Sequence, residues 1–338
     1  MKRRAFLQTI GLAAAAWTRG RAAGEDTLPI QTVTGPVLPQ NLALALTHEH
    51  VLVDFIGADQ VSRSRYERDA VARVARPHLV RARELGVRTL FECTPAFLGR
   101  DPLLLRRLSE ETRLRLVTNT GLYGARQNRF LPDYAHTETA RQLAARWIRE
   151  ATEGIEETGI RPGFIKCGVD PAPELSAVHA KLVDAAGLTH VATGLSIAIH
   201  TGSGPGLAQL DRLRALGVSP EAFVWVHAHG ATDDVLFAAA DRGAWLSFDG
   251  LNHPTLVRHR NLCVEMKRRG HLEQVLLSHD AGWFDPAKPD GGPFRPFDVM
   301  SRLFLPRLIE AGFTTAELMT LLVTNPARAF TPRRRLVG

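Results

Sequence analysis

The sequence has little cysteine and no N-terminal apolar run long enough to cross a bilayer, and each absence excludes a class of protein. Three cysteines in 338 residues cannot form the disulfide framework that is typical of small cysteine-rich domains. The apolar run near the N-terminus is too short for a membrane anchor. No internal repeat, low-complexity tract or linker divides the chain. We therefore expect one globular domain, in which Cys93 and Cys167 are buried free thiols.

Residues 1–24 have the pattern of an export signal. A basic start precedes a short apolar run and several small residues, and no acidic residue occurs before Glu25. This order of regions is typical of a cleaved secretory signal. Arg3 and Arg4 resemble the pair of a twin-arginine signal, which carries folded proteins to the periplasm. The single mature domain is expected to comprise residues 25–338.

The formal charge of +7 does not indicate a nucleic-acid partner. Five of the positive charges lie in the expected signal and would be removed with it. The remaining basic clusters, 267–269 and 333–335, have no interleaved aromatic residues and are expected to be solvated surface. We expect a small-molecule substrate, no nucleic acid, and no membrane association after the signal is removed.

Eight short apolar runs alternate with segments of helical spacing. Such runs are typical of parallel strands that are buried on both faces. The doubly wound sheet is the rival architecture, but it needs a glycine-rich phosphate turn after its first strand, where this chain reads THEH. The pattern therefore predicts an α/β fold, a (β/α)8 TIM barrel. The runs are 42–46, 87–93, 114–118, 163–167, 195–199, 223–226, 244–248 and 274–277, and two clear helical segments are 69–85 and 137–157.

Side chains able to bind metal follow several of these runs. In a β/α barrel the carboxyl ends of the strands meet at one face, which carries the active site. The sequence therefore predicts that these side chains form one site. They are His48 and His50 after the first run, Lys166 in the fourth, His200 after the fifth, His227 after the sixth and Asp280 after the last.

His48 and His50 are two residues apart, so on a strand both face the barrel axis and could chelate one divalent ion. Glu49 between them should point outward, toward a salt bridge with the helices. Lys166 would repel a cation as an ammonium. If its amine reacted with carbon dioxide, the resulting carbamate would be an anion able to bridge two metals.

At two places, spacing alone does not decide which of two nearby residues is the metal ligand. His227 and His229 share strand parity in WVHAHG, and His227 is favoured as a ligand because it is nearer the apolar run. His279 and Asp280 are adjacent, so only one can face inward if the strand continues. Asp280 is favoured, because a carboxylate can both bind a metal and accept a proton.

These motifs resemble the phosphotriesterase-like family of the amidohydrolase superfamily. The matching features are ALTHEH, GRD, TGLY and SHD, in order, together with the strand positions of Lys166, His200 and His227. The resemblance runs from about Gly35 to Phe330. It implies an amidohydrolase-type barrel with a binuclear metal centre. In that centre His48, His50 and Asp280 would hold the more buried metal, His200 and His227 the more exposed one, and carbamylated Lys166 would bridge them.

The resemblance also implies a mechanism and an assembly. A metal-bridging hydroxide would be the nucleophile, and Asp280 would accept its proton. Tyr123, in TGLY, would lie beside the metals and position substrate, or it would be a packing residue of the barrel rim. Trp283 and Phe284 could wall an apolar pocket or cover the barrel edge. Zinc suits the nitrogen-rich ligands, with cobalt, manganese or iron as alternatives. Similar barrels are often homodimers.

The sequence departs from the family pattern after the seventh strand. Gly250 follows Asp249 where phosphotriesterases that relay a proton have His and many lactonases have Arg, so Asn252 or His253 could enter the pocket instead. Asp249 could orient a substrate donor. We therefore expect an ester-type bond, in a lactone or carboxylic ester, as the substrate. The alternatives are phosphotriester, phosphodiester or amide hydrolysis on the same metals. The non-enzyme alternative is an exported metal-binding or solute-binding barrel.

Overall fold

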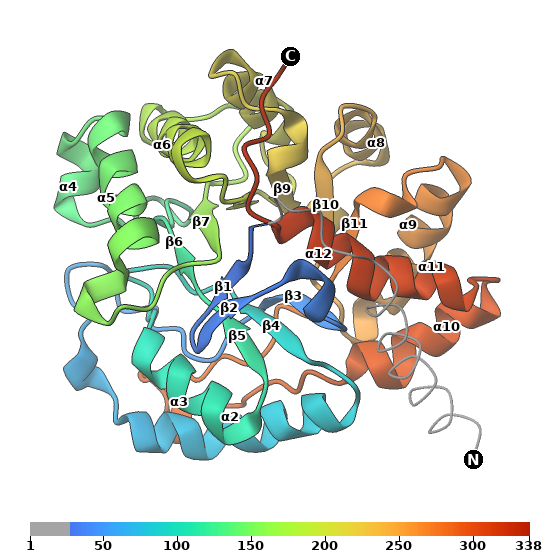
Figure 1. Cartoon of the computed structure of the whole chain (residues 1–338), viewed down its shortest axis with the longest axis horizontal. Helices are drawn as coiled ribbons and strands as arrows, with labels where there is room; N and C mark the ends of the chain where they lie inside the picture. Colours follow the sequence, from blue (N-terminus) through green and yellow to red (C-terminus); the bar gives the residue numbers. More distant parts are fainter. Residues whose placement is uncertain (1–27) are drawn as a thin grey trace.

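Parallel strands alternate with helices along residues 28–338, which are the residues that the computed structural model describes. The strands form a ring and the helices surround it (Figure 1). The fold is the predicted (β/α)8 barrel. The export signal predicted for residues 1–24 lies outside the described residues.

The strands of the barrel follow the chain in order around the ring. Neighbouring strands pair in parallel, in the ladders β3-β4-β5 and β6-β7-β8-β9-β10-β11. Each of the eight predicted apolar runs overlaps a strand. The strands are β3 (Ala45–Glu49), β4 (Thr89–Glu92), β5 (Arg115–Val117) continued by β6 (Asn119–Thr120), β7 (Phe164–Gly168), β8 (Ile197–His200), β9 (Phe223–Val226), β10 (Trp245–Phe248) and β11 (Val275–Leu277).

Individual hydrogen bonds, rather than a regular ladder, join the last strand to the first. The N–H of His48 donates to Ser278 Oγ (2.9 Å), and the N–H of Asp280 donates to the carbonyl of His48 (3.1 Å). Two residues after His48, the N–H of His50 donates to the carbonyl of Ala281 (2.9 Å). This seam brings the first and last predicted metal ligands together, although more than 200 residues separate them in the chain.

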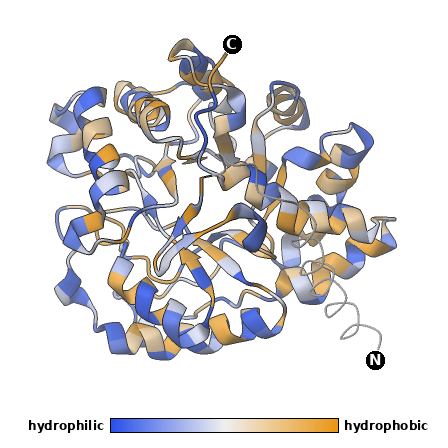
Figure 2. Cartoon of the chain, viewed as in Figure 1, coloured by the Kyte–Doolittle hydropathy of each residue, from blue (hydrophilic) through white to orange (hydrophobic). Residues whose placement is uncertain are grey.

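The helices form the outer layer, and their residues alternate between hydrophilic and hydrophobic along each helix (Figure 2). This mixture is expected where one helix face packs on strands and the other meets solvent. The helices are α2 (Arg68–Glu84), α3 (Pro102–Thr112), α4 (Asp133–Thr137), α5 (Ala140–Glu153), α6 (Ala177–Thr193), α7 (Gly206–Ala215), α8 (Asp233–Asp241), α9 (Leu256–Arg268), α10 (Leu305–Glu310), α11 (Thr315–Met319) and α12 (Asn325–Phe330).

Two local features differ from the sequence predictions. The helix expected over 137–157 is divided, because Thr139 and Gln142 form a reciprocal capping box that starts α5 at Ala140. Gly154, with φ of 113°, ends the same helix. An antiparallel hairpin, β1 (Ile30–Thr32) with β2 (Gly35–Val37), precedes the barrel and was not predicted.

The interior of the ring is packed with side chains and closed at the amino ends of the strands. Phe91 and Phe330 stack there with their ring centroids 4.2 Å apart. Ser196, just before β8, donates to the carbonyl of Ala329 in α12 (2.5 Å). The carboxyl ends remain the open side. Cys93 and Cys167 are buried free thiols, as predicted. Across residues 28–338, no helix combines the length and the apolar character needed to traverse a membrane.

Candidate metal centre

A cavity of about 290 Å³ opens at the carboxyl ends of the strands. Two ligand candidates follow the ends of β9 and β11, and the others lie at or beside the ends of β3, β7 and β8. The structure thus brings all of the predicted site residues to one place. Its lining includes His48, His50, Tyr123, Lys166, His200, His227 and Asp280.

A larger cavity of about 550 Å³ lies at the other end of the barrel, where Trp245 begins β10. Two of its arginines are paired with acidic neighbours, Arg328 with Glu273 (2.5 Å) and Arg333 with Glu221 (3.2 Å), and the third, Arg335, donates to the carbonyls of Arg328 and Thr331. Since no histidine or cysteine lines it, this cavity has no comparable set of metal donors.

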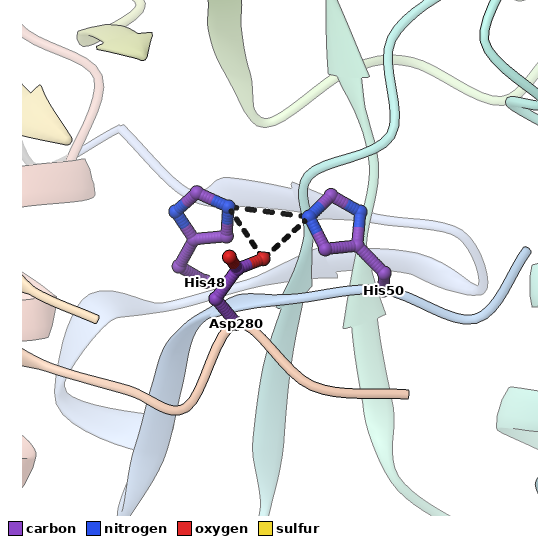
Figure 3. Close-up of side chains that lie close together, drawn as sticks. All are labelled: His48, His50 and Asp280. Atoms are coloured by element: carbon purple, nitrogen blue, oxygen red, sulfur yellow. Dashed lines mark hydrogen bonds and ion pairs between the residues drawn. The ribbon is translucent and has the colours of Figure 1, made fainter. Parts of the chain in front are cut away.

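Three side chains at the floor of the first cavity form a compact group (Figure 3). The Nε2 atoms of His48 and His50 are 3.3 Å apart. One carboxylate oxygen of Asp280 lies 3.1 Å from Nε2 of His50 and 3.7 Å from Nε2 of His48. These atoms can therefore converge on a single ion.

The hydrogen bonds behind this group decide which ring nitrogens are free. His48 donates through Nδ1 to Asp249 (3.0 Å). His50 donates through Nδ1 to Thr94 Oγ1 (2.8 Å), whose hydroxyl donates in turn to Glu92 (2.6 Å). In their neutral forms both imidazoles therefore direct Nε2 lone pairs at each other and at a carboxylate. Three electron-rich atoms this close suit a cation, so the residues fit the expected metal.

Asp249 is the main support of the site, and it has no exposed surface. Its carboxylate accepts from Nδ1 of His48 and also from Nδ1 of His227 (2.6 Å). Burial raises the pKa of Asp249, but the two imidazoles outweigh burial and hold its pKa well below the usual value. The group His48, His227 and Asp249 could itself be read as a metal site. Because Asp249 already accepts from both Nδ1 atoms, it orients the two rings instead of binding an ion. The expectation that Asp249 orients a substrate donor is wrong, because Asp249 does not line the cavity.

Lys166 is 1% exposed and has no carboxylate partner among the described residues. Its Nζ donates to the carbonyl of Cys167 (3.2 Å) and lies 5.4 Å from the ring centroid of Tyr123. Burial lowers the pKa of Lys166, since an unpaired ammonium is costly away from water. The neutral amine is the form that can add to carbon dioxide, so the surroundings of Lys166 fit the carbamate.

His200 and His227 lie beside this lysine, with their rings edge to face at 4.5 Å. Strand β9 ends at Val226, and His227 has a left-handed backbone, with φ of 61°. The assumption that His227 and His229 share strand parity is therefore wrong. His227 enters the cavity, whereas His229 turns to stack on His259, with ring centroids 4.7 Å apart.

Asp280 also has a left-handed backbone, with φ of 53°, three residues after β11 ends. Burial raises the pKa of Asp280, but the neighbouring histidines outweigh burial and lower it to about 2. His279 faces away and donates to Glu49 (2.6 Å). Glu49 points away from the axis as expected, but its partners are His279, Ser278 and the N–H of Ala281, rather than a cation of the helices.

One side of the cavity is apolar. Phe55 and Trp283 lie against each other with centroids 5.4 Å apart, and Val53 and Leu98 continue the surface. Of the two aromatic residues expected after Asp280, only Trp283 lines the cavity, whereas Phe284 packs among core residues.

Tyr123 lies beside the metal-binding side chains, with its ring centroid 5.1 Å from that of His200. Burial raises its pKa, so its phenol stays protonated at neutral pH. Neither Asn252 nor His253 lines the cavity. Asn252 instead caps the short helical turn that it precedes.

Three contributors were missed from the sequence, namely Glu92, Thr94 and Arg126. The first two orient His50 through hydrogen bonds, and Arg126 lines the cavity mouth. Only proximity to a strand end could have drawn attention to Thr94, and no sequence signal points to Arg126.

Comparison with known proteins agrees with this geometry. The sequence profile of the phosphotriesterase family matches residues 28–330. A phosphotriesterase homology protein of Mycobacterium tuberculosis is 30% identical over 325 aligned positions, which cover 89% of this chain and 97% of that protein. An aryldialkylphosphatase of Saccharolobus solfataricus is 28% identical, over 86% of this chain and 96% of its own.

Among solved structures, a mutant of the organophosphorus hydrolase of Deinococcus radiodurans superposes with a TM-score of 0.81 at 27% identity. The superposition covers 92% of this chain and 99% of that one. The family uses a binuclear metal site, and the histidine and aspartate groups described above could bind metal. The resemblance found in the sequence is confirmed: the chain belongs to the phosphotriesterase family, and it is a metal-dependent hydrolase.

Proposed function

We propose that the protein hydrolyses an ester bond at a carbonyl carbon, in a lactone or an open-chain carboxylic ester, with two divalent metal ions. The observation that carries the proposal is the convergence of Nε2 of His48, Nε2 of His50 and a carboxylate oxygen of Asp280 within 3.7 Å, at the floor of a cavity with one apolar side. The apolar side suits the hydrocarbon part of an ester.

The donor atoms suit two ions rather than one. When bound, the ions supply Lewis-acid activation of the carbonyl oxygen and of a water molecule. Nitrogen-rich ligands favour zinc, and cobalt, manganese or iron are the alternatives. The trio His48, His50 and Asp280 would hold one ion, His200 and His227 would hold the other, and a carbamate on Lys166 would join them.

The protein's own groups then have distinct tasks. Asp280 is ionised at neutral pH and faces the floor of the cavity, so it would accept the proton released by the attacking water. The phenol of Tyr123 stays protonated and would donate a hydrogen bond to the substrate. Phe55 and Trp283 would hold the apolar part of the ester and exclude water from it.

Attack at a carbonyl is preferred over attack at phosphorus because the site lacks residues that would carry a proton away from Asp280 or donate one to a poor leaving group. Gly250 has no side chain to carry a proton outward from Asp280. His229 is packed against His259, so it does not supply an acid for an amide nitrogen.

Phosphotriester hydrolysis is the second candidate. It is supported by the names of the Saccharolobus and Deinococcus relatives, which share this fold and most of the chain length. A substrate panel should therefore include a dialkyl aryl phosphate beside lactones and aryl carboxylic esters.

The test combines metal content with turnover in the purified protein. We expect about two metal ions per chain and hydrolysis of lactones or carboxylic esters above the rate for the phosphotriester. The variant Lys166→Ala should lose both metal and turnover. Lys181→Ala is the matched control, because Lys181 donates only to surface carbonyls of His136 and Glu138.

Three outcomes would contradict the proposal in different ways. A phosphotriester turned over faster than every carboxylic ester would replace the substrate class while keeping the metal centre. A single ion per well-folded chain, retained in Lys166→Ala, would refute the carbamate bridge. Two bound ions with no hydrolysis across the panel would favour the metal-binding protein without turnover.

We also propose that the mature chain works in the periplasm, on the support of the residues 1–24 pattern alone. Cell fractionation of the full chain and of an Arg3→Lys, Arg4→Lys double variant tests this. The double variant should remain in the cytoplasm, and its recovery in the periplasm would contradict twin-arginine export.

A further inference from the structure

Arg126 stands at the mouth of the cavity, on a turn with an unusual backbone. It and the next two residues, Gln127 and Asn128, have φ values of 60°, 60° and 62°. Residues with a side chain avoid this left-handed region, and they remain in it only where neighbouring contacts impose it. Three in succession indicate that the surrounding structure holds this turn in one shape.

The contacts that hold the turn are specific. The N–H of Gln127 donates to both carboxylate oxygens of Asp170 (3.2 and 3.1 Å). The N–H of Asn128 donates to the carbonyl of Gly124 (3.0 Å). Nε2 of His179 lies 3.0 Å from that same carbonyl and 3.0 Å from the side-chain oxygen of Asn128. The turn is therefore fastened at its start and at its end.

The result is a positioned guanidinium. Its central carbon lies 4.9 Å above the ring of Phe55, which forms the apolar side of the cavity together with Trp283. Within residues 28–338 no ion pair or side-chain hydrogen bond is formed by Arg126. Asp170, which with Asp280 makes up the acidic lining of the cavity, accepts from the N–H of Gln127.

The other cation in the cavity has a different place. Lys166 lies at the floor among the histidines, and in the proposed enzyme it carries a carbamate. Arg295, which stacks on Trp283 at 4.4 Å, does not line the cavity and donates to the carbonyl of Asp280. Arg126 is thus the lining cation whose five N–H donors remain free for a ligand.

We propose that Arg126 binds an anionic group of the substrate, so that the substrate is an ester whose acyl chain ends in a carboxylate or a similar anion. This inference rests on the proposed ester hydrolysis in the same cavity and defines its substrate class. The guanidinium can bind a carboxylate through two parallel hydrogen bonds. Phe55 and Trp283 lie where the methylene groups between the anion and the scissile carbonyl would pass.

Matched pairs of esters test the inference kinetically. The probes are the para-nitrophenyl monoesters of adipic and pimelic acid, with para-nitrophenyl hexanoate and heptanoate as neutral partners of equal chain length. In the metal-loaded wild type, kcat/KM should favour the anionic ester of each pair. In Arg126→Gln the ratio of anionic to neutral kcat/KM should fall about tenfold, as expected for loss of a charge-assisted hydrogen bond.

Two further variants separate recognition from a general effect of charge. Arg126→Lys keeps the charge without the two-pronged geometry, so its ratio should lie between those of wild type and Arg126→Gln. Arg129→Gln removes the same charge three residues away, from a side chain that donates to the carbonyl of Ile56 and does not line the cavity. Its ratio should stay at the wild-type value. Raising ionic strength should lower the wild-type ratio, because exposed charges are screened.

A binding measurement decides the inference without turnover. Calorimetric titration of the metal-loaded protein with adipate and with hexanoate should show tighter binding of adipate in wild type and no such difference in Arg126→Gln. A wild-type kinetic ratio near one, or a ratio that survives Arg126→Gln, would overturn the role of Arg126. If no ester is hydrolysed, the proposed function fails, and the adipate titration alone supports or overturns anion binding by Arg126.

Discussion

Replacing Asp249 by asparagine should weaken both metal positions at once. In the structure its carboxylate accepts from Nδ1 of His48 (3.0 Å) and from Nδ1 of His227 (2.6 Å). Asparagine has the same shape, but its NH2 group cannot accept a hydrogen bond. The imidazole that meets the NH2 group must either turn away or move its own proton to Nε2. In both cases a lone pair is lost from one metal position, and the other imidazole keeps only an uncharged, weaker acceptor.

The size of the effect follows from the outer-shell position of Asp249. Loss of one such partner lowers metal affinity by about 10- to 100-fold. This range corresponds to about 1.4 to 2.7 kcal/mol. Because His48 and His227 belong to different proposed ions, Asp249→Asn should weaken both, with the larger loss at the ion whose histidine meets the NH2 group. Thr94→Val removes the acceptor of His50 alone, so only the ion of His48, His50 and Asp280 should weaken.

The assay is a titration of the metal-stripped protein with zinc in competition with a chromophoric chelator, beside thermal melting of each variant. Asp241→Asn is the control, because Asp241 also accepts from an imidazole, that of His271 (2.9 Å), but on the surface. Its two affinities should equal those of wild type. Unchanged zinc affinities in a well-folded Asp249→Asn would refute the view that this carboxylate orients the ligands.

Three further predictions concern other parts of the molecule. A Cβ at Gly250 would lie 2.4 Å from Nε2 of His229. Gly250→Ala should therefore lower the free energy of unfolding, measured by urea denaturation, by about 1 to 3 kcal/mol. An unchanged free energy of unfolding would mean that His229 can move aside without cost. Glu150→Gln should cost about 1.5 to 3 kcal/mol, because it removes the charged hydrogen-bond partner of the buried Arg100 guanidinium (2.7 Å) and leaves it only Glu156, at 3.5 Å, as an ionised partner. Burial raises the pKa of Glu150, but the neighbouring Arg100 outweighs burial and lowers it. The extra stability of wild type over Glu150→Gln should therefore be present above about pH 4.3 and be lost as the pH falls through the pKa of Glu150 in the folded protein. A stability difference that is independent of pH would contradict the pairing. Tyr123→Phe should lower kcat while metal content stays constant, and unchanged kcat would make Tyr123 a packing residue.

The barrel could be predicted from the sequence because its strands are buried on both faces. The run 223–226 matches β9 residue for residue, and the other runs overlap their strands within a few residues. The β1–β2 hairpin escaped prediction because it contains only three residues in each strand. Thr139 and Gln142 have the spacing of a capping box, which predicts a helix start at this point. The prediction of one helix over 137–157 followed the apolar spacing alone and therefore missed this start.

The grouping of the site residues could also be predicted, because the ends of parallel strands meet at one face. Their supporting residues could not. Nothing in the sequence around Asp249 predicts that its partners are His48, on β3, and His227, just after β9. Hydrogen bonds of this kind depend on the stagger of neighbouring strands around the ring, and apolar spacing within one strand carries no information about that stagger.

Sequence spacing could not predict the side-chain direction of residues whose backbone is neither extended nor right-handed helical. His227 and Asp280 both have left-handed conformations just beyond a strand, and Arg126 has one in its turn. Arguments from strand parity assume extended backbone, so they stop being valid at the positions where the side chains turn into the cavity. Left-handed residues other than glycine persist where surrounding contacts impose them, and such residues cluster at functional sites. In this barrel the left-handed backbone of His227, Asp280 and Arg126, rather than their spacing in the sequence, therefore accounts for the entry of these three side chains into the cavity.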